Sequence, residues 1–134
     1  MSGYMTKTLL VEDNRDYRAS LKELLSAHFP DVLIIEAENG AEALRAHALF
    51  EPNVAFVDIN LPGNMNGLEV VERIRSEDWQ VRIIVITNHD LPEYREASAR
   101  LGADHFLPKA STTSDDILAV MEAVKSALHG GLDR

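Results

Sequence analysis

Residues 54–63 read Val-Ala-Phe-Val-Asp-Ile-Asn-Leu-Pro-Gly, a short apolar run that ends in a carboxylate and is followed by turn-forming residues. Four consecutive apolar residues bounded by turn signals predict a strand that is buried on both faces, as in a parallel sheet. A charged group at the end of such a strand is costly to remove from water. Ligands of open α/β sheets bind just beyond the carboxyl ends of the strands, so Asp58 is the first candidate for chemistry.

Strand-like and helix-like patterns alternate five times along the chain, in units of about 20 to 25 residues. This alternation predicts an α/β fold, a five-stranded parallel sheet with helices on both faces. The expected helices follow stripes of apolar residues at helical spacing, and the pair Gly130-Gly131 is expected to end the last helix. The expected strands cover residues 6–11, 32–37, 54–57, 81–86 and 103–107.

Length, charge and cysteine content limit the classes of function. The 134 residues are enough for one domain with one sizeable core. The absence of cysteine excludes a disulfide scaffold and a thiolate metal site, and no long apolar run or signal peptide is visible, so we expect a cytoplasmic domain without a membrane span. A formal net charge of −9 argues against direct nucleic-acid binding by this domain.

Charged and hydroxyl side chains follow four of the five expected strands. Strand one runs into Glu12 and Asp13, strand three ends in Asp58, strand four in Thr87, and strand five is followed by Lys109. In a parallel sheet these ends lie along the same edge. Taken singly, Asp58 could merely cap a turn, and Thr87 or Lys109 could be structural. Together they predict one pocket with three carboxylates, a hydroxyl and an ammonium.

Carboxylates this close repel one another, so the expected pocket requires a compensating cation or retained protons. Mg²⁺ prefers oxygen ligands, and Glu12, Asp13, Asp58 and the backbone carbonyl of Asn60 are the candidate ligands. Lys109 adds a fixed positive charge. Such a pocket suits phosphoryl transfer, which depends mostly on positioning and electrostatic stabilisation, and a carboxylate there can itself become phosphorylated.

The chain resembles the receiver domain of response regulators, the CheY-like module of two-component signalling, over residues 6–129 of a single domain spanning 1–134. The resemblance implies a flavodoxin-like, doubly wound (βα)5 fold with strand order 2-1-3-4-5. Residues 107–111, Leu-Pro-Lys-Ala-Ser, further resemble receivers of NarL/LuxR-type regulators. The residues that carry the resemblance are Glu12-Asp13, Asp58 with Pro62 and Gly67 after it, Thr87, and Lys109 with Phe106 three positions before.

The resemblance implies a signalling switch rather than an ordinary enzyme. Asp58 would accept a phosphoryl group from a histidine kinase or phosphotransfer protein, with Mg²⁺ or Mn²⁺ held by the carboxylates. Thr87 and Lys109 would bind phosphoryl oxygens, and Phe106 would turn inward as Thr87 moves. The face formed by the fourth helix, fifth strand and fifth helix would then control a partner, a homodimer or a fused DNA-binding output domain, with transcription as the expected output.

Two departures from the family pattern keep an alternative open. The loop 59–66 is one residue longer than the common form, and Asn88 stands where the family usually has a small residue. The alternative is a divergent receiver that acts as a dimerisation or docking module without phosphorylation. A phosphohydrolase would need a second acid two residues after Asp58, where Asn60 stands. A flavin or nucleotide carrier would need a phosphate-binding loop after the first strand, where Glu12-Asp13-Asn14 would repel phosphate without a metal.

Overall fold

The computed structural model describes residues 5–132, with side chains described through residue 128. Strands and helices alternate as the sequence predicts, with one short 3-10 helix before the last α-helix. The elements are β1 (Thr6–Val11), α1 (Arg15–His28), β2 (Val32–Ala37), α2 (Gly40–Phe50), β3 (Val54–Val57), α3 (Gly67–Glu77), β4 (Arg82–Thr87), α4 (Pro92–Leu101), β5 (His105–Pro108), η1 (Lys109–Ser111) and α5 (Ser114–Leu132).

The five strands form one parallel sheet in the order β2-β1-β3-β4-β5, which confirms the predicted flavodoxin-like topology. All four residues of β3 are fully buried, as the apolar run 54–57 predicted. The order reverses at β1, which pairs with both β2 and β3. A ligand site is expected where the strand order reverses, at the carboxyl edge of the sheet.

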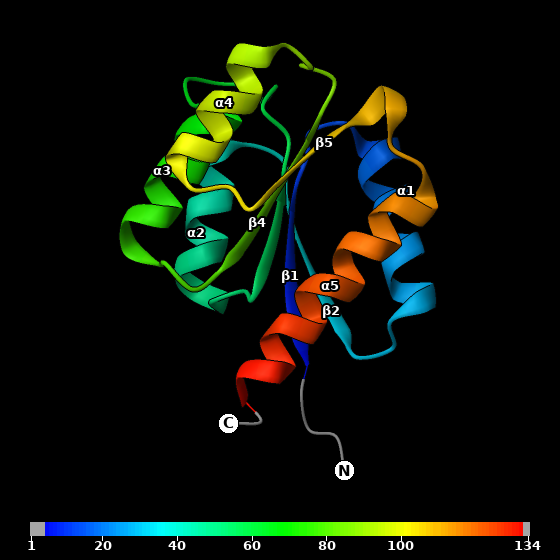
Figure 1. Ribbon diagram of the computed structural model, residues 1–134. Coiled ribbons are helices and arrows are strands. Elements are labelled where there is room, and N and C mark those ends of the chain that lie inside the picture. The colour runs from blue at the N-terminus through cyan, green and yellow to red at the C-terminus, as the bar shows by residue number, and fades with distance from the viewer. Residues whose placement is uncertain (1–4, 133–134) are drawn as a thin grey trace.

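Helices cover both faces of the sheet, and each face has its own apolar cluster. Figure 1 shows α2, α3 and α4 on one side and α1 with α5 on the other. The first cluster includes Leu9, Val57 and Val71, and the second includes Leu10, Phe56 and Met121. Successive residues of a strand point to opposite faces, so the adjacent residues Leu9 and Leu10 belong to different clusters.

Asparagine side chains cap the first three helices. Asn14, Asn39 and Asn66 each have extended backbone, and each side chain accepts a hydrogen bond from the backbone N–H three residues later. Such caps satisfy donors that have no partner within the helix. They fix where α1, α2 and α3 begin, immediately after the loops that leave the carboxyl edge of the sheet.

Three predicted elements have different bounds in the structure: β4 covers Arg82–Thr87 rather than 81–86, and the other two are α5 and β5. Helix α5 continues through Gly130-Gly131 to Leu132, because glycine lowers helix propensity by about 1 kcal/mol relative to alanine without forbidding the helix. The fifth strand covers His105–Pro108 rather than 103–107, since Gly102 closes α4 in the left-handed conformation and the Ala103 N–H still donates to the Ser98 carbonyl of that helix. None of the helices within residues 5–132 has the length and apolarity to cross a membrane.

Candidate functional site

Sheet register brings the predicted site residues together at one edge. The backbone N–H of Asp58 donates to the carbonyl of Val11, which places Asp58 beside the start of the acidic pair. Thr87 pairs with Pro108, the last residue of β5, so Lys109 follows directly after the partner of Thr87. The side chains that leave these four strand ends therefore share one pocket, as the sequence indicated.

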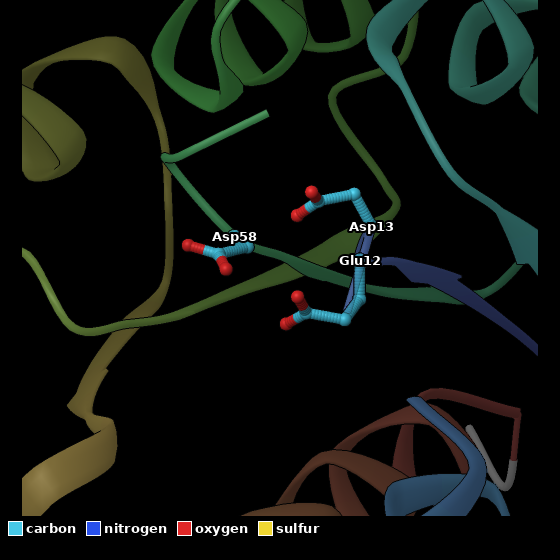
Figure 2. A group of neighbouring side chains, drawn as sticks. All are labelled: Glu12, Asp13 and Asp58. Atoms are coloured by element: carbon cyan, nitrogen blue, oxygen red, sulfur yellow. The ribbon is translucent and has the colours of Figure 1, made fainter. Parts of the chain in front are cut away.

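Three carboxylates meet at this edge. One oxygen each of Glu12, Asp13 and Asp58 lies within 4.8 Å of the others. Figure 2 shows the three carboxylates turned to the same side, beyond the ends of β1 and β3. Glu12 and Asp58 are buried, whereas Asp13 is exposed at the mouth of the pocket. Burial raises the pKa of the Glu12 carboxyl, and the nearby charge of Asp58 acts in the same direction.

Both oxygens of the Asp58 carboxylate have donors within the chain. Oδ1 accepts the Thr87 hydroxyl at 2.7 Å and the Asn60 backbone N–H at 3.1 Å. Oδ2 accepts the Lys109 ammonium at 3.0 Å. The contact with Asn60 is the turn-capping role that Asp58 alone would indicate, and it coexists with the contacts to Thr87 and Lys109.

The Lys109 ammonium joins two of the three carboxylates. Its Nζ lies 2.8 Å from Glu12 Oε1 and 3.0 Å from Asp58 Oδ2, and the Lys109 side chain is only 11% exposed. Burial disfavours the ammonium, but the two carboxylates outweigh it and raise the pKa of Lys109. Lys109 is therefore cationic at neutral pH and offsets part of the negative charge of the pocket.

The donor set fits a divalent cation. Glu12 Oε1 is buried and accepts no hydrogen bond of good geometry from the described residues, although the ammonium lies beside it. Three carboxylates face this one ammonium, so the pocket keeps negative charge that a bound cation would offset. With the exposed Asp13 at the mouth, the three carboxylates match the oxygen ligands that Mg²⁺ prefers.

A buried arginine behind the acidic pair was not predicted. Arg18 donates to the Glu12 carbonyl at 2.6 Å and to Glu36 Oε1 at 2.8 Å, so it ties α1 and the end of β1 to β2. The sequence does indicate that Arg18 is buried, because it precedes Leu21 and Leu25 at spacings of three and four and so lies on the buried face of α1. Arg18 supports the backbone that carries Glu12.

Phe106 of β5 pairs with Val85 of β4 and is partly buried against the first apolar cluster, on the face of the sheet that α4 covers. The Arg95 guanidinium of α4 covers its ring at 4.6 Å from the centroid and also contacts Asp90 at 2.8 Å. A cation over an aromatic face is attracted by the ring quadrupole. The present position of Phe106 is therefore stabilised from the α4 side.

The two departures from the family pattern lie on the solvent side. Asn88 is exposed next to the buried Thr87. The loop 59–66 is anchored by the buried side chains of Ile59 and Leu61, while its residues 62–64 are exposed. The strands on either side of this loop keep their register with their neighbours.

Residues 8–122 match the response regulator receiver domain family, and the chain belongs to it. The fold and the pocket at the carboxyl edge agree with this membership, and the family is one of signalling switches.

Named relatives include NarL/LuxR-type regulators. The chain is 32% identical to the nitrate/nitrite response regulator protein NarL of Escherichia coli K12, over 86% of this chain and 53% of NarL. It is 33% identical to the transcriptional regulatory protein YdfI of Bacillus subtilis 168, over 89% of this chain and 54% of YdfI. The chain thus spans about half the length of these curated relatives.

Solved structures show the same fold. The signal receiver domain of the response regulator NarL from Mycobacterium tuberculosis superposes with a TM-score of 0.81 at 30% identity, covering 91% of this chain and 98% of that one. A LuxR-family DNA-binding response regulator from Staphylococcus aureus gives a TM-score of 0.82 at 27% identity, with 90% and 98% covered. The predicted resemblance to NarL/LuxR-type receivers is confirmed.

Proposed function

We propose that Asp58 is a phosphoacceptor in a two-component signalling pathway. The observation that carries this proposal is the Asp58 carboxylate itself, which is held by Thr87 and Lys109 and lies within 4.8 Å of two further carboxylates. An Asp58 oxygen would attack the phosphorus of a phosphohistidine. The P–N bond would break, the imidazole would leave with a proton, and the product would be an aspartyl phosphate.

The proposed metal ligands are Glu12, Asp13, Asp58 and the backbone carbonyl of Asn60, for Mg²⁺ or Mn²⁺. When bound, the cation neutralises negative charge that the incoming phosphoryl group adds to an already acidic pocket. Lys109 contributes the second positive charge, from the β5 side of Asp58. The chain's own part is therefore to orient Asp58 and to hold one cation beside it.

The proposed switch begins with the two groups that hold Asp58. On phosphorylation Thr87 and Lys109 would exchange carboxylate oxygens for phosphoryl oxygens, and Phe106 would turn into the space that Thr87 leaves. Two charge-assisted contacts contribute about 1.5–3 kcal/mol each. Moving a two-state equilibrium from mostly inactive to mostly active takes about 5 kcal/mol, so two such contacts are of the right order.

The proposed partners follow from the family and from the relatives. A histidine kinase or phosphotransfer protein would supply the phosphoryl group in the cytoplasm. The face formed by α4, β5 and α5 would form a homodimer or control an output domain. A fused DNA-binding domain in a longer protein is supported by the relatives, since one similar structure is of a DNA-binding response regulator. In this proposal residues 1–134 form a single receiver unit.

A second candidate function is a docking or dimerisation module that works without phosphorylation. The observation that favours it is that both carboxylate oxygens of Asp58 already accept hydrogen bonds, from Thr87, Asn60 and Lys109. These hydrogen bonds give Asp58 a structural role that does not depend on phosphorylation. The exposed Asn88 beside Thr87 also stands close to where a phosphoryl group would enter.

Incubation with acetyl phosphate and Mg²⁺ separates the two functions by intact mass. The proposal expects the mass of one phosphoryl group on the wild-type chain, and none on Asp58→Asn or after chelation of the metal. Asp104→Asn is the matched control, because it also removes a carboxylate but lies just before β5, beside Ile83 at the opposite end of β4 from Thr87. A wild-type chain that stays unlabelled beside a labelled control receiver would favour the docking module.

A further inference from the structure

Lys109 has a third neighbour besides its two carboxylates. Its Nζ lies 4.2 Å from the centroid of the Tyr17 ring. Tyr17 belongs to α1, which covers the face of the sheet opposite α4 (Figure 1). With the side chain 11% exposed, the ammonium is nearly removed from water. A cation–aromatic contact strengthens when the cation is desolvated. The ring of Tyr17 is thus well placed to hold this ammonium.

The position of Tyr17 depends on the site itself. Glu12 Oε2 accepts the backbone N–H of Asn14 at 3.0 Å, and Asn14 Oδ1 accepts the backbone N–H of Tyr17 at 2.9 Å. The Tyr17 ring then faces Lys109, whose ammonium returns to Glu12 Oε1 at 2.8 Å. These four contacts form a closed ring of interactions that joins Glu12, the first turn of α1 and Lys109.

The three neighbours of Lys109 differ in what else they do. Under the proposed function, Glu12 binds the metal and Asp58 accepts the phosphoryl group, so both carboxylates are drawn to other partners during transfer. Tyr17 carries no charge at neutral pH, because burial raises the pKa of its phenol further. It neither binds the metal nor accepts the phosphoryl group. Its attraction for the ammonium therefore persists while the carboxylates are engaged elsewhere.

We propose that Tyr17 is a positioning residue that keeps the Lys109 ammonium over the pocket during phosphoryl transfer, an inference that rests on the proposed function. The aromatic face does this without adding negative charge that would compete for the metal. The phenol hydroxyl has no part in the contact, so phenylalanine can replace tyrosine and an aliphatic residue cannot.

Two measurements on the same variants test this inference. The first is the ¹⁵N NMR signal of the Lys109 ammonium, which is visible when its protons exchange slowly with water. We expect the signal in wild type and Tyr17→Phe, and its loss in Tyr17→Leu. The second is the rate of Asp58 labelling by acetyl phosphate with Mg²⁺, which should fall about fivefold in Tyr17→Leu and stay within about twofold in Tyr17→Phe.

Leu24→Ala is the matched control, because Leu24 lies on the same helix and packs, partly buried, against the same apolar cluster as Tyr17. It should keep both the ammonium signal and the labelling rate. The inference is overturned if Tyr17→Leu keeps both, if Leu24→Ala loses them equally, or if wild type shows no slowly exchanging Lys109 signal. A wild-type chain with the signal but without label overturns the proposed function, and with it the role of Tyr17 in transfer.

Discussion

The hydroxyl of Thr87 donates a hydrogen bond of 2.7 Å to Oδ1 of Asp58, between two side chains that are both buried. The two residues lie 29 positions apart and meet because β3 and β4 are neighbours in the sheet. The proposed switch requires Thr87 to leave this carboxylate for a phosphoryl oxygen. Thr87 thus stabilises the unphosphorylated site with the same hydroxyl that would respond to phosphorylation.

Removing the Thr87 hydroxyl should lower the free energy of unfolding far more when Asp58 is present than when it is replaced. Thr87→Val removes a donor to a buried carboxylate, which should lower the free energy of unfolding by about 1.5–3 kcal/mol. In an Asp58→Ala background the same substitution should cost much less, because no carboxylate then needs the donor. Urea unfolding of the four proteins measures the coupling. Equal costs in the two backgrounds would show that the hydrogen bond contributes nothing.

Gly67, the first residue of α3, packs so closely against the backbone of Asp58 that we expect no larger residue to fit there. A Cβ at Gly67 would lie 2.1 Å from the Asp58 carbonyl oxygen, a backbone atom that cannot swing aside. We expect Gly67→Ala to lower the free energy of unfolding by at least about 2 kcal/mol, and to slow labelling of Asp58 because the carboxylate is displaced.

Gly63 offers the matched control for this substitution. Its φ of +91° strains any other residue, but a Cβ there meets nothing within 4 Å. Gly63→Ala should therefore cost about 1 kcal/mol and leave the labelling rate unchanged. If chemical unfolding and labelling fail to distinguish the two alanine variants, the close approach at Gly67 is not a constraint on the site.

Removing the cation over Phe106 should favour the switched state. Arg95 holds the ring at 4.6 Å and is about half exposed, so the contact is worth about 0.5–1 kcal/mol. Arg95→Gln should raise the fraction of phosphorylated protein with Phe106 turned inward by about two- to fivefold. ¹⁹F NMR of 4-fluorophenylalanine at position 106 measures this fraction. Arg100→Gln removes a charge from the same helix, and identical spectra for the two variants would contradict the prediction.

The ion pairs of Glu36 should make stability depend on acid pH. Hydrogen bonds from Arg18 and then from Lys22 lower the pKa of Glu36 below its ordinary value of 4.5. A lowered carboxyl pKa contributes stability that is complete above the unfolded-state value and is lost as the pH falls through the folded-state value. Stability of wild type should therefore fall as the pH drops below 4.5.

Chemical unfolding across this acid range compares wild type with Glu36→Gln, in which this part of the pH dependence should be missing. Lys22→Gln removes one of the two donors and should show an intermediate slope. Parallel curves for wild type and Glu36→Gln would mean that the pairing of Glu36 does not differ between the folded and unfolded chains.

The fold was predictable because its signals are local. The buried strand 54–57, the alternation of apolar patterns and the strand ends are read from neighbouring residues, and parallel pairing then fixes one edge for the site. The end of α5 was predicted wrongly at Gly130-Gly131, since a local preference of about 1 kcal/mol per glycine is easily outweighed.

Beyond the residues at the four strand ends, the sequence did not reveal the side-chain contacts between elements. Tyr17 is not among the predicted site residues, yet its ring faces Lys109, 92 positions further along the chain. Arg18 joins α1 to Glu36 on β2. Such contacts depend on rotamers and on how the helices pack against the sheet, which no local pattern specifies.

The central claim is that Asp58, among the three clustered carboxylates, takes the phosphoryl group. Borohydride reduces an aspartyl phosphate to homoserine, so reduction after labelling with acetyl phosphate and Mg²⁺ marks the acceptor permanently. Tandem mass spectrometry of the digested chain should find homoserine at position 58, with Glu12 and Asp13 unchanged. A reduced residue at position 12 or 13, or none in a sample that gained a phosphoryl mass, would contradict the assignment of Asp58.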